Sequence, residues 1–281
     1  MLGRPVASGP RAGSTPKPIR LPRRRAPPLY RFPMDELTTW IVLALAGMVA
    51  GVINTLAGGG SLLTVPILVF LGLPATTANG TNRIGVLFQN IMSTLRFRRE
   101  GFDGLRGAWP VLIPVMIGSA IGATLASRIS AALFQQIFGV AMIALLYPML
   151  RSARPATKDP PAAPRSGFGN SLIFVGIGVY GGAIQAGVGL FLIAALARSG
   201  LDLVRANSIK VVIIGVFTLV AVPVFIAHGH VDWTLASALI VGFALGGEIG
   251  ARAAIQGGER LIRPVLVFAV LTMSGRMLGL Y

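Results

Sequence analysis

The chain alternates between long apolar stretches and short polar links from Leu37 to its end. Most of these stretches approach the length of about 20 residues with which an α-helix spans a bilayer. We trace ten of them, at 37–57, 61–73, 81–97, 108–127, 131–150, 171–187, 189–200, 207–227, 233–254 and 261–280. The pattern predicts an all-α polytopic membrane protein.

Two of the stretches, 61–73 and 189–200, are too short to cross a membrane. A helix of about 12 residues rises about 18 Å, whereas the hydrocarbon core is about 30 Å thick. A glycine-rich run precedes each stretch and a polar break follows it, at 57–61 and 79–83 for the first and at 187–189 and 207–210 for the second. We therefore expect two short half-helices beside breaks in the chain.

The two breaks are related by a fixed offset of 128 residues, which pairs Gly59 with Gly187 and Asn79 with Asn207. The offset predicts an internal duplication, in which each repeat has four long helices and one half-helix. The expected organisation is a first transmembrane repeat at 34–150, a linker at 151–170 and a second transmembrane repeat at 171–281. Because five crossings per repeat reverse the second one, we expect two inverted repeats.

The distribution of basic residues fits this arrangement. Fourteen of them cluster in four links, around 96–106, 151–165, 198–210 and 252–263. If all ten stretches cross and both ends of the core lie outside, the four links all face the cytoplasm, as the positive-inside rule requires. The linker is accordingly expected to be cytoplasmic.

Residues 1–33 run against this rule, because they carry eight Arg or Lys residues and no acidic residue. They have no apolar periodicity, which predicts a disordered basic leader. The leader is either a basic tail that lies on anionic lipid or an upstream extension of a chain that starts at Met34. We favour the extension, because a start at Met34 removes eight positive charges from the outer side.

Composition excludes a soluble enzyme. Hydrophobic residues make up 54% of the chain and charged residues only 12%, about half of the roughly 25% found in globular domains. The absence of cysteine excludes disulfides, thiolate nucleophiles and cysteine metal sites, and only two histidines are present. We therefore expect a protein that is not an enzyme and that holds no metal and no cofactor.

Two runs in the first repeat resemble the signature of a known family: AGGGSLLTVP at 57–66 and ANGTN at 78–82. They are similar to the sulfite exporter TauE/SafE family of membrane anion transporters. The resemblance implies movement of sulfite, sulfonates or related organosulfur anions, coupled to an ion gradient. The second repeat departs from the signature, because it lacks the triple glycine, has no counterpart of Pro66, and places Lys210 where Asn82 stands. The substrate therefore stays open.

Broken helices at equivalent positions of two inverted repeats indicate the central site of a transporter. Backbone N–H groups at the start of a half-helix attract anions, and glycine lets the backbone approach the ligand closely. The expected substrate-binding residues are Asn54, Gly58, Gly59, Gly60, Ser61, Asn79, Thr81, Asn82, Arg83, Gln185, Gly187, Gly189, Asn207, Ser208 and Lys210.

Simpler roles stay open for several of these residues. The glycines could serve only close helix packing, as we expect for the pairs Gly118/Gly122 and Gly246/Gly250. Arg83 and Lys210 could extend to the membrane interface, as long cationic side chains near helix ends often do. Other polar residues are expected to have structural roles: Gln89 and Asn90 to bridge helices, and His228, His230 and Asp232 to lie in a solvated loop.

Glu248 is the acidic residue that lies deep in a long apolar stretch. Such a carboxylate is a hypothesis for a functional group, here a carrier of the coupling proton or cation. Alternatively, Arg252 lies four residues later on the same helical face and would neutralise it.

The sequence thus predicts a multi-pass protein of the cell inner membrane that moves a small anion by alternating access. The alternatives are an anion channel, an intramembrane enzyme or an assembly subunit. The expected partners are the lipid bilayer, a small anionic substrate and a coupling proton or cation, with no nucleic acid. The oligomeric state, the direction of transport and the coupling ion stay open.

Overall fold

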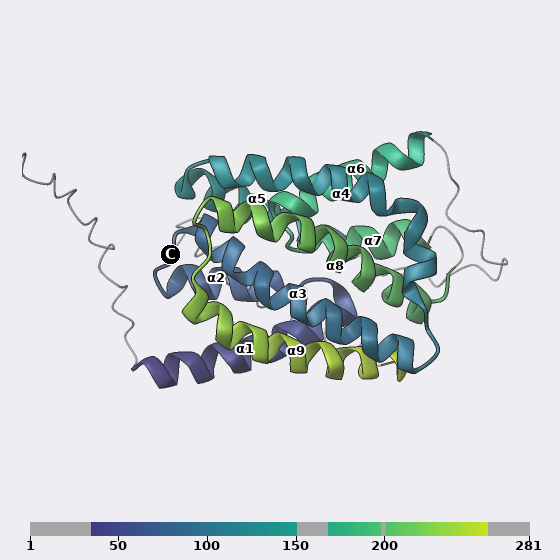
Figure 1. Cartoon of the computed structure of the whole chain (residues 1–281), viewed down its shortest axis with the longest axis horizontal. Coiled ribbons are helices and arrows are strands. Elements are labelled where there is room, and N and C mark those ends of the chain that lie inside the picture. The colour runs from purple at the N-terminus through teal and green to yellow at the C-terminus, as the bar shows by residue number, and fades with distance from the viewer. Residues whose placement is uncertain (1–34, 151–167, 198–200, 258–281) are drawn as a thin grey trace, which may run out of the picture. The chain divides into compact units, whose positions relative to one another are not determined.

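The computed structural model describes residues 35–150, 168–197 and 201–257, and within these ranges the chain forms helices and no strand. The helices are α1 (Glu36–Ala57), α2 (Ser61–Phe70), α3 (Ala75–Arg99), α4 (Gly104–Arg128), α5 (Ala131–Leu150), α6 (Phe168–Ala183), α7 (Val188–Ala197), α8 (Leu203–Ala227) and α9 (Trp233–Ile255), as Figure 1 shows. The all-α prediction is confirmed for these residues. The expected leader, most of the linker and the tenth stretch lie outside them.

Several helices start earlier than the hydropathy pattern predicts. The runs 79–83 and 207–210, expected as polar breaks, lie inside α3 and α8. Aspartates N-cap three of the long helices: Asp103 accepts a hydrogen bond from the N–H of Leu105, and Asp202 and Asp232 do the same at the starts of α8 and α9. Side chains that satisfy the first free N–H groups of a helix fix its start, and hydropathy alone does not register them.

Asp35 caps α1 in the same way, with its carboxylate accepting hydrogen bonds from the side chain and the backbone N–H of Thr38. The Thr38 hydroxyl, and then its N–H, hold the pKa of the Asp35 carboxyl below its usual value.

The helix bounds follow the offset of 128 residues. α8 begins and ends 128 residues after α3, and α2, α4 and α6 match α7, α9 and α1 to within a few residues. α3 and α8 run in opposite directions, because Gly80 near the start of α3 packs against His230 beyond the end of α8. Gly104, beyond the end of α3, likewise packs against Ser208 near the start of α8.

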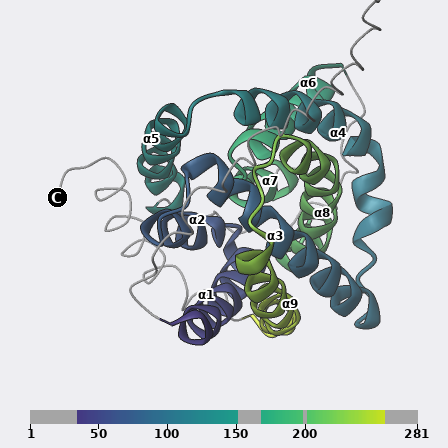
Figure 2. The ribbon, with the colours of Figure 1, turned by 60° about the vertical axis from the view of Figure 1, so that its left-hand side comes forward.

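Helices from the two halves of the chain pack against each other. α1 packs along α9 and α4 along α6, as Figure 2 shows, while α3 contacts both α8 and α9. Glycines make these contacts close: a Cβ on Gly51 of α1 would lie 3.0 Å from Gly246 of α9. Gly118 and Gly122 of α4 meet the backbone of α6 in the same manner. The expectation of a packing role for both glycine pairs is confirmed.

α1, α4, α8 and α9 are long and apolar enough to cross a membrane. Their outward side chains are apolar; on α4, for example, Trp109 is 72% and Ile113 is 69% exposed. α3 has the length of α4, but eight of its buried side chains are polar. They are the amides, the guanidinium and the hydroxyls of Thr76, Asn79, Thr81, Asn82, Arg83, Gln89, Asn90 and Ser93. α3 therefore carries much of the polar interior of the described part of the chain.

Candidate substrate site

The two glycine-rich breaks predicted at 57–61 and 187–189, which separate α1 from α2 and α6 from α7, meet in the structure. α1 ends at Gly58, whose φ of 77° is left-handed, and α6 ends before Gln185 and Gly187, whose φ values are 65° and 69°. A Cβ built on Gly58 would overlap the backbone of Gly189, the second residue of α7. Only glycine permits both this conformation and this approach of two backbones. The contact places the start of α7 against the end of α1.

A hydrogen-bonded network fills the space around the first break. Asn54 near the end of α1 donates to the Gln89 Oε1 of α3 at 2.6 Å and accepts from the Gly60 N–H at 3.4 Å. Gln89 in turn donates to the hydroxyls of Thr55 at 2.8 Å and of Ser93 at 3.2 Å. Gln89 thus bridges α1 and α3, as predicted.

Asn82 joins α3 to the start of α2. Its Nδ2 donates to the Ser61 hydroxyl at 2.9 Å, and its Oδ1 accepts from the Thr64 hydroxyl. Both amide atoms of Asn54, Gln89 and Asn82 therefore have partners. Thr55, Thr64 and Ser93 were not among the expected site residues, because hydroxyl residues are common in membrane helices and carry no distinctive pattern.

Lys210 is fully buried and binds the end of α1. Its Nζ donates to the carbonyl oxygens of Thr55 at 2.6 Å and Asn54 at 3.3 Å, and to Asn207 Oδ1 at 2.6 Å. A cation at this position also meets the partial negative charge of a helix C-terminus. The alternative that Lys210 extends to the membrane interface is wrong, because the packed end of α1 encloses its ammonium group.

Arg83 is fully buried at the end of α6 in the same way. Its Nη1 and Nη2 donate to the carbonyl oxygens of Gly181 at 3.1 Å and Gly182 at 2.7 Å. Asn79, one turn earlier in α3, donates to the next carbonyl, that of Ala183, at 2.9 Å. The guanidinium also lies 4.7 Å from the ring centre of Phe225. The interface alternative is therefore wrong for Arg83 as well.

The two breaks thus receive a cation from opposite halves of the chain. Lys210 from the second half binds the end of α1, and Arg83 from the first half binds the end of α6. The cations do not match at the offset of 128, since Lys210 corresponds to Asn82. Alignment of the two halves therefore does not reveal that Lys210 and Arg83 share a role. That role depends on the helix C-terminus to which each side chain binds.

Two of the expected site residues have other roles. The Thr81 hydroxyl accepts from the N–H of Asp232 at 2.9 Å, in the link between α8 and α9. The Ser208 hydroxyl donates to the Arg205 carbonyl within the first turns of α8. The structure does not bring either side chain into the hydrogen bonds around the breaks, whereas Gly59 lies in the first break itself.

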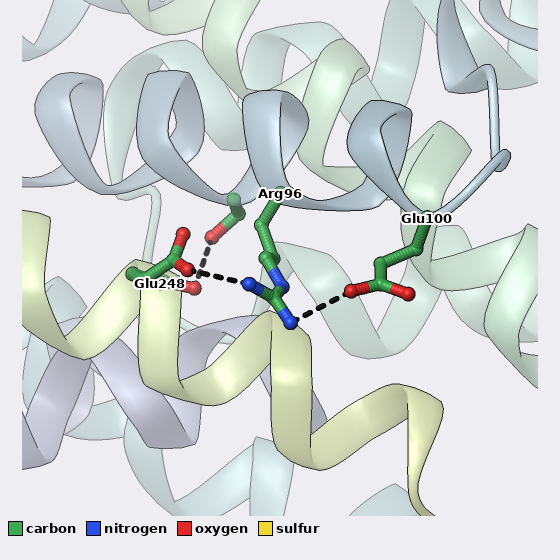
Figure 3. A network of polar contacts seen from close by, with 5 residues as sticks. Arg96, Glu100 and Glu248 are labelled. Carbon is green, nitrogen blue, oxygen red and sulfur yellow. Dashed lines mark hydrogen bonds and ion pairs between the residues drawn. The ribbon is translucent and has the colours of Figure 1, made fainter.

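Glu248 forms an ion pair with Arg96 of α3, as Figure 3 shows. The two side chains lie 3.2 Å apart, and Arg96 also binds Glu100 at 2.7 Å. The partner of Glu248 is therefore Arg96 on a neighbouring helix, not Arg252 on its own helix. The sequence could not supply this pairing, because 152 residues separate the two side chains.

The histidines lie in the link after α8, as expected. His230 contacts the Ser127 carbonyl at 3.0 Å and His228 the Val224 carbonyl at 2.8 Å. Within the described ranges no group of histidine and carboxylate side chains is arranged to hold a metal ion.

Comparison with known proteins identifies the family. The family model of the sulfite exporter TauE/SafE matches residues 43–277. This chain belongs to the sulfite exporter TauE/SafE family. The family is one of membrane transporters, and the chain is a multi-pass protein of the inner membrane, as predicted.

Curated relatives share most of the chain. It is 28% identical to a protein of Haemophilus influenzae named "Probable membrane transporter protein", over 84% of this chain and 93% of the relative. It is 30% identical to the "Probable membrane transporter protein YfcA" of Escherichia coli K12, over 84% and 88% of the two chains. For "Probable membrane transporter protein YunE" of Bacillus subtilis the identity is 27%, over 76% and 88%. No solved structure matches the chain.

Proposed function

We propose that this TauE/SafE protein is a secondary transporter that carries a small anion, namely sulfite, a sulfonate or a related organosulfur oxyanion, by alternating access. The observation that carries the proposal is the contact of the two breaks at Gly58 and Gly189, together with the buried cations Lys210 and Arg83 at the ends of α1 and α6. Breaks of this kind bind substrates in transporters with repeated architecture.

The charge at the breaks favours an anion. Each cation lies at a helix C-terminus, which carries a partial charge of about −0.5. This partial charge is smaller than the full positive charge of the cation. Two such sites in a low-dielectric interior attract a small oxyanion. The glycine backbones at 58–60 and at Gly187 and Gly189 allow the ligand to approach the N–H groups at the starts of α2 and α7.

The duplication supports alternating access. Repeats at 34–150 and 171–281, joined by a cytoplasmic linker at 151–170, would be inverted relative to each other. The opposite directions of the equivalent helices α3 and α8 support the inversion. Movement of one repeat against the other about the meeting point of the breaks would then expose the site to each side in turn.

Reconstitution tests the proposed activity. The purified protein in liposomes is offered radiolabelled sulfite, thiosulfate, alkanesulfonates and small carboxylates, with protein-free liposomes as the control. We expect uptake of a sulfur oxyanion that saturates with concentration and responds to an imposed ion gradient. Uptake that never saturates would identify a channel instead, and absence of uptake for every anion would contradict the proposal.

The inverted topology predicts that the two links after α3 and α8 face opposite sides of the membrane. The chain has no cysteine, so single cysteines can be introduced at Arg106, in the first turn of α4 after the first link, and at His228 in the second link; both residues are exposed. In intact cells, an impermeant thiol reagent added outside is expected to label His228→Cys and to spare Arg106→Cys until the membrane is permeabilised. Labelling of both positions, or of Arg106→Cys alone, would contradict the inversion.

For the coupling ion, we propose that Glu248 carries a proton. Glu248→Gln is then expected to lower proton-driven accumulation at least tenfold and to preserve exchange of substrate across the membrane, because an amide cannot release a proton. Arg96→Gln is the matched control, since it breaks the same ion pair but keeps the carboxylate. Both assays are run on the same reconstituted preparation. Equal losses in the two variants would show that Glu248 acts only as the partner of Arg96.

A further inference from the structure

The second break differs from the first in the polar atoms that it leaves without a partner. Asn79 Oδ1, Arg83 Nε and Gln185 Oε1 are buried and have no hydrogen-bond partner among the described residues. Their side chains are 0%, 0% and 3% exposed. At the first break, by contrast, Asn54 and Asn82 have partners for both amide atoms. A buried polar atom without a partner costs about 1–3 kcal/mol, so three such atoms next to one break favour a ligand there.

The chemistry of two of these atoms is fixed by their neighbours. Asn79 Nδ2 binds the Ala183 carbonyl, which can only accept a hydrogen bond, so the amide cannot be turned round and its Oδ1 is an acceptor. Both terminal nitrogens of Arg83 bind carbonyls of α6, which leaves the Nε–H as a donor. Gln185 is less restricted, because its partner Thr218 has a hydroxyl that either donates or accepts.

The unpaired donor and acceptor lie at the same helix end. Asn79 and Arg83 are one turn apart on α3, and they bind the consecutive carbonyls 181–183 at the end of α6. Gln185 follows two residues later, in a left-handed conformation that a residue other than glycine adopts only where its surroundings hold it. A donor from a cation and a neutral acceptor thus belong to two side chains that hold the end of α6, next to the break that separates it from α7.

We propose that the second break binds an anion that itself carries a hydrogen-bond donor. Arg83 Nε–H would bind an anionic oxygen of the ligand, and Asn79 Oδ1 would accept from an N–H or O–H group next to it. A fully deprotonated oxyanion, or a sulfonate with an apolar tail, leaves Asn79 Oδ1 unpaired or facing another oxygen. Sites built to bind a donor discriminate strongly against analogues that lack it. This inference rests on the proposed transport of anions and narrows its substrate class.

Isosteric ligands test the inference on the intact protein. Binding of 2-aminoethanesulfonate, 2-hydroxyethanesulfonate and propane-1-sulfonate is measured by calorimetry in detergent; the three differ only in the terminal ammonium, hydroxyl or methyl group. We expect at least one donor-bearing ligand to bind tenfold or more tightly than propane-1-sulfonate. Preference for the ammonium alone identifies a zwitterion as the ligand, and preference for both identifies a general need for a donor; either outcome supports the inference.

The variant Asn79→Leu tests whether Asn79 Oδ1 is the acceptor that causes the preference for donor-bearing sulfonates. In this variant we expect the ratio of the affinity for the donor-bearing ligand to the affinity for propane-1-sulfonate to fall to about one. Propane-1-sulfonate itself should bind at least as tightly as before. Asn90→Leu is the matched control, because Asn90 lies eleven residues further along α3, donates to a backbone carbonyl as Asn79 does and also has a buried, unpaired Oδ1; it should keep the ratio. Since the ratio is first measured in the unaltered protein, misfolding of a variant does not leave the question undecided.

The outcomes separate this inference from the proposed function. Equal affinities for the three sulfonates in the unaltered protein, together with saturable uptake of a labelled anion, would overturn the donor requirement and leave anion transport standing. Absence of both binding and uptake for every anion would overturn both. A preference that persists in Asn79→Leu would also overturn the role of Asn79.

Discussion

Gly58→Ala is expected to disrupt the meeting of the two breaks. The added Cβ would overlap the backbone of Gly189, which cannot rotate away as a side chain can. The φ of 77° adds backbone strain for alanine of about 1 kcal/mol, and overpacking adds about 1–3 kcal/mol. We therefore expect a destabilisation of about 2–4 kcal/mol and loss of anion uptake, measured by thermal unfolding in detergent and by liposome transport.

The control variant Gly101→Ala separates the effect of backbone strain in Gly58→Ala from the effect of its close contact with Gly189. Gly101 has a φ of 87°, and nothing lies within 4 Å of the Cβ that alanine would place there. This variant is expected to lose about 1 kcal/mol and to keep its transport rate. Gly189→Ala approaches the same contact from the other side, at a helical position without strain, and should impair transport as Gly58→Ala does. Wild-type transport by Gly58→Ala would refute the close contact of the breaks.

Lys210→Met is expected to separate the end of α1 from α8. The substitution keeps an unbranched side chain but removes the donor to the carbonyls of Asn54 and Thr55 and to Asn207. Acceptors left without a donor in a buried place destabilise the fold by about 3 kcal/mol in total. The loss of a positive charge beside the site should also weaken anion binding at least tenfold, measured by calorimetry with the best transported anion.

Arg205→Met is the matched control on the same helix. It also removes one positive charge from α8, but Arg205 is largely exposed and pairs with Asp202 at 3.3 Å on the surface. Such exposed pairs contribute little to stability. We therefore expect nearly unchanged unfolding and binding. Equal behaviour of Lys210→Met and Arg205→Met would exclude a special role for the buried cation.

Predictions from the sequence were accurate where they depended on local features. The glycine runs at 57–61 and 187–189 correctly indicated α2 and α7, which are both short and adjoin breaks. Prediction from the local hydropathy pattern was wrong for the starts of several helices. Polar residues such as Asn79 and Asn207 interrupt a hydropathy pattern without interrupting a helix, since they hydrogen-bond to neighbouring helices inside the protein.

The hydrogen-bond and ion-pair partners of the buried polar groups could not be predicted from the sequence. Arg83 and Lys210 were identified as candidates, but nothing in their spacing indicates that each binds the end of a helix in the opposite half. The same holds for Glu248, for which the sequence suggested Arg252 because only helical neighbours can be inferred from spacing. Residues about 100 to 150 positions apart become neighbours only through the packing of α3 with α8 and α9.

By itself, the sequence determined that this protein is helical and lies in a membrane, that it belongs to the TauE/SafE family, and where its two short helices lie. These properties follow from composition and from apolar stretches, which act along the chain and need no knowledge of its neighbours. Only the tertiary structure decided that Gly58 meets Gly189, and that the buried amides Asn54 and Asn82 at one break have partners while Asn79 and Arg83 at the other stay incompletely paired. The reason is physical: a buried polar group must find its partner among whatever backbone and side chains the packing brings within about 3 Å of it.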